Sequence, residues 1–206
     1  MKQKNQIEFQ LSKPFSLGVE IELQILDKSD LNLVPRAPEI LAMVPSELKE
    51  RIKPEFIRSM IEVNTEVCTN MDHAKKNLTH LIQQAEKIAA ANNCLLFATS
   101  LHPFARYSDQ VLSSHPRYNR IMDDLQLVGR RFITQGLHVH VGMDNHEDAI
   151  RVCDNLRLFL PILLALTCSS PYYEGIDTGL HSYRAMLFEA LPLSGMPDEL
   201  ENWEKY

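Results

Sequence analysis

Apolar and polar side chains alternate almost without interruption from Phe15 to Leu26, which is the pattern of a half-buried β-strand. Successive side chains of a strand point to opposite faces, so Glu20 and Glu22 share one face. Same-face neighbours lie roughly 7 Å apart, and two anions at that distance repel each other unless positive charge lies beside them. A hard cation such as Mg²⁺ supplies that charge. The segment therefore predicts a strand of a β-sheet and, on one face of it, a metal site with oxygen ligands.

Two further segments, residues 59–68 and 132–143, carry the same alternation. Their polar positions are Glu62, Asn64 and Glu66 in the first segment, and His138 and His140 in the second. A single polar face is what an antiparallel sheet normally shows to water. Three faces that hold carboxylates and imidazoles with almost no balancing cation favour a shared site.

Glu55 lies seven residues before Glu62, a spacing that would put the two on opposite faces of one unbroken strand. Either a bulge intervenes or Glu55 belongs to the preceding loop, and its place in the site is open on spacing alone. Gly136 and Gly142 remove side chains from the face of His138, which we expect to leave room for a ligand.

Helical periodicity separates the predicted strands. Asp72 is a candidate N-cap of a helix that ends near Asn92, and residues 116–129 form a helix with Tyr118 on its apolar side. Asp144 or Asn145 begins a long helix that ends near Ser169. We expect one domain over residues 1–206, an α+β fold in which helices cover one face of an antiparallel sheet.

Composition excludes several classes of function. The net charge is −6, and the basic residues are scattered, which argues against a nucleic-acid surface. The apolar run from Leu158 to Cys168 contains Pro161 and is too short to span a membrane, so it predicts a buried helix. The first residues lead to no apolar signal core and the four cysteines show no C-x-x-C spacing, which predicts a cytoplasmic protein.

A mostly carboxylate ligand set with one or two imidazoles favours Mg²⁺ or Mn²⁺ over Zn²⁺. Several carboxylates in one pocket would hold more than one ion, an arrangement that suits a nucleoside triphosphate. The chain contains no Gly-x-x-x-x-Gly-Lys-Ser/Thr motif, so we expect metal ions rather than a P-loop to hold the phosphates.

Five ordered motifs resemble one known family. They are Leu17-Gly-Val-Glu-Ile-Glu22, Glu55-Phe-Ile-Arg-Ser-Met-Ile-Glu62 with its continuation to Cys68, Ser100-Leu-His-Pro-Phe-Ala105, Gln135-Gly-Leu-His-Val-His-Val-Gly142, and Ser182-Tyr-Arg184 with Leu191-Pro-Leu-Ser-Gly-Met-Pro197. Together they resemble the glutamate-cysteine ligase type 2 family, the bacterial carboxylate-amine ligases.

The resemblance implies a glutamine synthetase-like antiparallel sheet with ATP and Mg²⁺ on its open face. Such enzymes convert the γ-carboxylate of glutamate to an acyl phosphate, and an amine, often that of cysteine, then displaces phosphate to give a γ-glutamyl amide. Residue by residue, the resemblance implies metal ligands at Glu20, Glu22, Glu55, Glu62 and His138, nucleotide or substrate contacts at Asn64, Thr65 and His140, and a carboxylate- or phosphoryl-binding catalytic cation at Arg184.

The resemblance also implies a longer protein, because family members continue through a C-terminal half. We therefore expect an incomplete catalytic domain: a fragment, one piece of a split enzyme that pairs with a C-terminal half, or a shortened non-catalytic homologue. An open sheet edge also makes a homo-oligomer plausible. A metal-dependent hydrolase that uses His138 and His140 is a further alternative.

Overall fold

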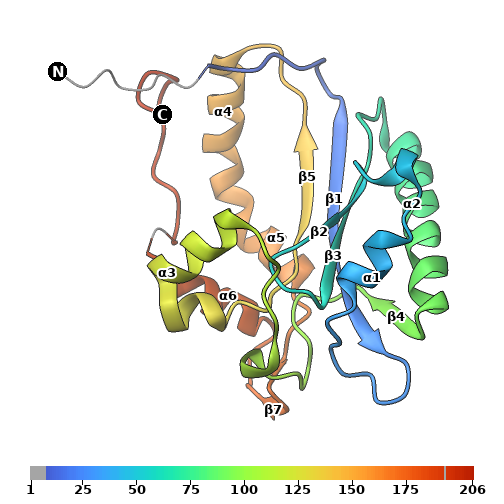
Figure 1. Ribbon diagram of the computed structural model, residues 1–206. Helices are drawn as coiled ribbons and strands as arrows, with labels where there is room; N and C mark the ends of the chain where they lie inside the picture. Colours follow the sequence, from blue (N-terminus) through green and yellow to red (C-terminus); the bar gives the residue numbers. More distant parts are fainter. Residues whose placement is uncertain (1–7, 193) are drawn as a thin grey trace.

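The computed structural model describes residues 8–192 and 194–206, and its centre is an antiparallel sheet built around one long strand (Figure 1). This strand is β1 (Leu17–Asp27), which pairs along one edge with β3 (Met60–Asn64). Its other edge pairs with β5 (Leu137–Val141) near its start and with β4 (Cys94–Phe97) near its end. The short strand β2 (Ile52–Pro54) pairs with the far edge of β3. Residues 1–5 and Leu193, used in the sequence argument, lie outside the described part.

Two helices cover the apolar face of β1, as the alternation predicts. The long helix α2 (Met71–Ala91) and the short helix α1 (Ala37–Ala42) pack against Leu23 and Ile25, which are almost fully buried. A 3₁₀ turn, η1 (Ser46–Leu48), follows α1. The expected α+β fold with an antiparallel sheet and helices is confirmed, and this apolar layer holds the main core.

Asn70, rather than Asp72, caps helix α2. The Asn70 backbone is extended, and its side chain accepts a hydrogen bond from the His73 N–H at 2.9 Å. Asp72 lies in the first turn of the helix, where its charge complements the helix dipole. The prediction was wrong by two residues because two candidate capping residues precede the periodic stretch, and only backbone geometry separates them.

A second, smaller core lies on the acidic side of the sheet, at the end away from the start of β1. Met60, which faces Gln24 across the β1–β3 pair, packs there with Leu187 of helix α6 (Tyr183–Glu189). Helix α3 (Pro116–Arg130), the turn η2 (Tyr107–Asp109) and the hairpin β6 (Tyr172–Tyr173) and β7 (Ile176–Asp177) complete this side of the fold. The acidic face is therefore walled at one end.

The predicted long helix begins at the expected cap but divides in two. Asn145 accepts a hydrogen bond from the Asp148 N–H at 2.7 Å, and helix α4 (His146–Leu156) passes through the turn η3 (Arg157–Phe159) into α5 (Leu160–Thr167). The expectation that the apolar run is buried is wrong, because no residue of α5 is buried. Among the described residues, no helix is long and apolar enough to cross a membrane.

Candidate metal and nucleotide site

Cross-strand pairing gathers the predicted polar residues on one face of the sheet. In the strand register, Glu22 stands opposite Glu62 of β3. Glu20 stands between Asn64 of β3 and His138 of β5. Directly opposed side chains lie about 5 Å apart at Cβ. Residues that are far apart in the chain therefore form two adjacent rows across the sheet. One row is Glu22 and Glu62, and the other is Asn64, Glu20 and His138.

Glu55 joins this face from a loop, which resolves the alternative left open by its spacing. It follows the end of β2 and precedes β3, so no bulge within β3 is needed. One carboxylate oxygen from each of Glu22, Glu55 and Glu62 lies within 4.8 Å of the others. Glu55 accepts hydrogen bonds from the backbone N–H of Phe56 and, at 3.2 Å, from the hydroxyl of Tyr118.

The cluster of Glu22, Glu55 and Glu62 is electrostatically unfavourable without a cation. Burial raises the pKa of Glu22 above its ordinary value, and the charges of Glu55 and Glu62 act in the same direction, against a 2.7 Å hydrogen bond from the Gly136 N–H. Burial also raises the pKa of Glu55, as does the charge of Glu62. Burial and the nearby Glu55 raise the pKa of Tyr118 to about 12, so its hydroxyl stays a donor.

Glu20 and the two histidines form a neighbouring group of their own. Glu20 contacts Nδ1 of His138 at 3.2 Å and Nε2 of His140 at 3.4 Å. Burial alone would raise the pKa of Glu20, but its hydrogen bonds to His138 and His140 outweigh that effect and lower the pKa. Neither Glu20 nor His138 offers an atom within the three-carboxylate cluster, as far as the described residues show. Their role as metal ligands stays a prediction.

The two glycines that flank β5, Gly136 and Gly142, make room for protein atoms. A Cβ added at Gly136 would lie 2.7 Å from Nε2 of His138, so the imidazole itself fills that space. At Gly142 a Cβ would lie 2.2 Å from Oγ of Ser16. The expectation of ligand space is therefore wrong at Gly142, where local packing fills it, whereas Gly136 both accommodates the imidazole of His138 and lines the cavity described below.

Asn64 lies beside the cluster, and only the NH₂ group of its side-chain amide forms a hydrogen bond among the described residues. Its Nδ2 donates to Oε1 of Glu62 at 2.7 Å, which fixes the direction of that carboxylate. Its Oδ1 is buried and has no hydrogen-bond partner among the described residues. A buried carbonyl oxygen without a donor is costly, and a cation or a ligand N–H or O–H would satisfy it.

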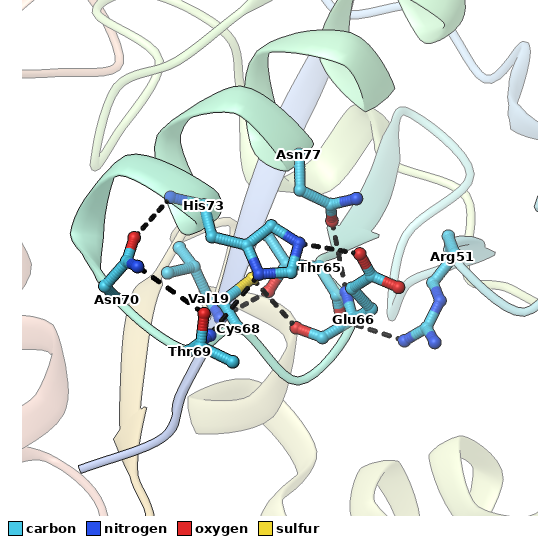
Figure 2. Close-up of polar contacts among 9 residues, drawn as sticks. All are labelled: Val19, Arg51, Thr65, Glu66, Cys68, Thr69, Asn70, His73 and Asn77. Atoms are coloured by element: carbon cyan, nitrogen blue, oxygen red, sulfur yellow. Dashed lines mark hydrogen bonds and ion pairs between the residues drawn. The ribbon is translucent and has the colours of Figure 1, made fainter.

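Thr65 and Glu66 belong to a loop that ties β3 to β1 and α2 (Figure 2). The Thr65 hydroxyl accepts a hydrogen bond from the Val19 N–H at 2.9 Å, and Nη1 of Arg51 donates to the Thr65 carbonyl at 2.8 Å. Glu66 pairs with Nε2 of His73 at 2.9 Å. The sequence placed Glu66 on the acidic face, which is wrong because β3 ends at Asn64 and the chain turns toward α2.

Arg184 faces the acidic side from helix α6. Its Nε donates to the Gln135 carbonyl at 3.0 Å, and its guanidinium carbon lies 4.2 Å from the centre of the Phe188 ring. Burial lowers the pKa of Arg184, and the charge of Glu22 opposes that shift. The side chain is thus oriented by the protein and lines the cavity that also contains Glu22.

This cavity has a volume of about 340 Å³ and an apolar wall from helices α3 and α6. Arg117 and Tyr118 of α3 line it beside Glu55, and neither was predicted from the sequence as a site residue. The only sequence signal for these two residues was that Tyr118 places a hydroxyl on an otherwise aliphatic helix face, next to Arg117. That signal is weak, because tyrosine is common in ordinary cores.

The donor set fits a hard divalent cation. In the described part of the chain, no lysine or arginine forms an ion pair with Glu22, Glu55 or Glu62. The three ligands that converge are all carboxylates, and the unpartnered oxygen of Asn64 lies next to Glu62. Oxygen donors of this kind suit Mg²⁺ or Mn²⁺, and the absence of histidine from the converging group disfavours Zn²⁺.

Known protein sequences match this chain over almost its whole length. The family described as glutamate-cysteine ligase family 2 (GCS2) matches residues 16–206. A provisionally named glutamate–cysteine ligase 2 of Gloeobacter violaceus is 38% identical over 202 residues, which are 97% of this chain and 54% of that protein. A similar protein of Rubrobacter xylanophilus, provisionally named glutamate–cysteine ligase 2-1, is 38% identical over 93% of this chain and 51% of its own length.

Comparison with solved structures supports the fold. A glutamate–cysteine ligase of Francisella tularensis, solved in complex with AMP, matches with a TM-score of 0.64 and 17% sequence identity. The match covers 86% of this chain and 43% of that protein. The chain thus spans about half the length of the curated relatives it matches.

Proposed function

The chain belongs to the glutamate-cysteine ligase family 2, and on that premise we propose that its acidic sheet face binds ATP with Mg²⁺ or Mn²⁺ in a carboxylate-amine ligase. The substrates we propose are glutamate and an amine, cysteine or another, which the ligase joins in a γ-glutamyl amide. The observation that carries this proposal is the convergence of Glu22, Glu55 and Glu62, none of which forms an ion pair with a lysine or arginine in the described part of the chain.

The proposed reaction has two steps. An oxygen of the glutamate γ-carboxylate attacks the γ-phosphorus of ATP, which forms an acyl phosphate and releases ADP. The amine then attacks the activated carbonyl carbon, loses a proton, and expels inorganic phosphate. A bound divalent cation supplies charge neutralisation at the phosphoryl oxygens. No nucleophile from the protein is required, so catalysis reduces to positioning and charge.

The residues of this face have distinct proposed tasks. Glu22, Glu55 and Glu62 hold the cation, and Asn64 orients Glu62 through its 2.7 Å hydrogen bond. Arg184 presents a fixed guanidinium to the cavity, which suits bidentate binding of a carboxylate or a phosphoryl group.

Glu20, His138 and His140 lie beside this cluster at the start of β1. We propose that His138 and Glu20 complete the metal shell when nucleotide binds, and that His140 contacts the nucleotide or substrate. Thr65 holds the β1 backbone next to Glu20 through Val19, and we propose that it also borders the bound nucleotide.

The test is formation of γ-glutamyl amide with release of ADP and phosphate from ATP, Mg²⁺, glutamate and cysteine. Glu55→Gln should remove product formation. Glu66→Gln is the matched control, because Glu66 pairs with His73 away from the cluster. Product that persists in the Glu55 variant, or a hydrolase activity that needs no ATP, contradicts the proposal. Binding of Mg-ATP without product would identify a non-catalytic or split homologue.

A further inference from the structure

The cavity next to the acidic cluster has a wall of apolar side chains that the rest of the fold leaves only half-buried. They are Phe56, Ile121, Leu125, Phe132, Phe188 and Leu191. Apolar surface that lines a cavity gains free energy when an apolar ligand displaces the water there. The cavity volume of about 340 Å³ lies in the range of pockets that enclose one small molecule.

Contacts within the protein hold this apolar wall in place. Tyr118, Ile121 and Leu125 lie about one helical turn apart on α3, so they share one helix face. Helices α3 and α6 lie side by side (Figure 1), and the ring of Phe132, just after α3, contacts the ring of Phe188 on α6 edge-on at 4.7 Å between centres. A wall of fixed shape lowers the cost of binding a ligand group there.

The apolar wall begins at the reacting end of the site. Glu22 and Glu55 of the acidic cluster line the same cavity. The guanidinium carbon of Arg184 lies 4.2 Å from the centre of the Phe188 ring, so this cation also borders the wall. A group that fills the cavity therefore belongs to a molecule whose reacting atom lies at the cluster. The nucleoside of ATP is separated from that point by the length of the triphosphate, which disfavours it as the occupant.

The reactants of the ligase proposed above, on which this inference rests, differ in the apolar surface they bring to the cluster. ATP brings a charged phosphoryl group there, and glutamate carries charge at both ends. Only the amine is free to carry an apolar group. We propose that the amine is an amino acid with a branched aliphatic or an aromatic side chain, and that the apolar wall binds this side chain. The CH₂SH group of cysteine would cover little of a wall of this size.

The state of Arg184 favours an amino acid over a simple amine. Its Nε donates to the Gln135 carbonyl at 3.0 Å. Its two terminal nitrogens, Nη1 and Nη2, make no hydrogen bond or ion pair with any residue that the structure describes. Paired N–H groups of a guanidinium bind a carboxylate in a bidentate manner. An α-carboxylate bound there would bring the side chain of the same molecule next to Phe188, at the start of the apolar wall.

Ligand binding tests the proposal without turnover. Saturation-transfer NMR measures the dissociation constants of leucine, phenylalanine, alanine and 3-methylbutylamine for the protein in Mg²⁺. We expect leucine or phenylalanine to bind about tenfold more tightly than alanine, because additional methylene groups in an apolar pocket are worth at least that factor. Equal binding of leucine and alanine, or displacement of leucine by adenosine, would overturn the proposal. Leucine should also bind more tightly than 3-methylbutylamine, which lacks the carboxylate, and equal binding of these two would overturn the part given to Arg184.

Substitutions in helix α3 locate the bound side chain. Ile121→Asn should raise the dissociation constant of leucine about tenfold and change that of alanine by less than about twofold. Leu127→Asn is the matched control, because Leu127 lies on the same helix, is 52% exposed and does not line the cavity. Leu125→Ala shortens the wall without adding a polar group, and it should also weaken leucine binding selectively if Ile121→Asn does not fold. Equal effects of Ile121→Asn and Leu127→Asn on leucine would contradict the proposal.

Turnover separates this proposal from the ligase function itself. Hydroxylamine is a small amine that needs no apolar pocket: its nitrogen attacks the acyl carbon of the phosphorylated glutamate, loses a proton and expels phosphate, which gives a hydroxamate. With glutamate, Mg²⁺ and ATP we expect this hydroxamate, and we expect kcat/KM for leucine to be about tenfold higher than for alanine. Hydroxamate formation with equal kcat/KM values for leucine and alanine would overturn the apolar acceptor alone. Absence of the hydroxamate would refute the ligase function on which the acceptor rests.

Discussion

Replacing Glu55 by glutamine should stabilise the metal-free protein. The change removes one negative charge and keeps a carbonyl oxygen that accepts from Phe56 and Tyr118. Two unit charges at 4.8 Å, the upper limit of the separations among the three carboxylate oxygens, interact by about 3.5 kcal/mol at an effective dielectric constant of 20. Because the three carboxylates are only half-buried, solvent screening reduces the gain to about 1–2 kcal/mol.

That gain corresponds to a rise in melting temperature of about 3–6 °C for a chain of this size. Saturating Mg²⁺ should reverse the order of the two proteins. At one hundred times its dissociation constant, a ligand stabilises the folded state by about 2.7 kcal/mol. The wild-type chain should gain this amount, and the Glu55→Gln variant should gain little.

Thermal unfolding in EDTA and in a Mg²⁺ titration measures both effects. Glu66→Gln serves as the control, because its partner is His73 rather than the cluster. A Glu55→Gln variant that is less stable than wild type in EDTA, and that keeps the full Mg²⁺ response, would refute the electrostatic reasoning. Equal responses of the Glu55 and Glu66 variants would refute it too.

Three further predictions follow from single contacts. Burial raises the folded pKa of Glu22 and of Glu55 above the ordinary value of 4.5, so the folded state binds more protons there than the unfolded state. Stability in EDTA should therefore fall as the pH rises from 4.5 through the folded pKa values, and denaturant titrations that start below pH 4.5 measure this. Thr65→Val leaves the Val19 N–H without its acceptor and should cost about 1–2 kcal/mol in urea unfolding, and Thr65→Ser should restore most of it. Asn64→Leu should weaken Mn²⁺ binding about tenfold by calorimetry, a loss of about 1.4 kcal/mol, and Asn64→Asp should strengthen it.

The sequence predicts the acidic face well because strand periodicity is a local rule, and Glu20 and Glu22 share a face in any strand. Their partners Asn64, Glu62 and His138 depend on the register between strands that are distant in the chain, which the alternation alone does not fix. Periodicity says less about where a strand ends. Residues 65–68 continue the alternation, yet their backbone leaves β3.

Loop contacts and partners are beyond such rules. Glu55 reaches the cluster because the connection from β2 to β3 folds back over the sheet, and Tyr118 reaches Glu55 because of how helix α3 packs. The apolar composition of α5 predicts burial, but composition carries no information on whether the neighbouring elements of the fold provide it. The exposure of Leu166 at 78% is therefore a finding of the structure alone.

Calorimetric titration of the protein with ATP, with and without Mg²⁺, is the decisive experiment for the metal–nucleotide site. We expect binding that requires the divalent cation, is lost in Glu55→Gln, and is retained in Glu66→Gln. ATP binding that is independent of Mg²⁺, or that survives the loss of Glu55 unchanged, would contradict the assignment of Glu22, Glu55 and Glu62 to a metal–nucleotide site.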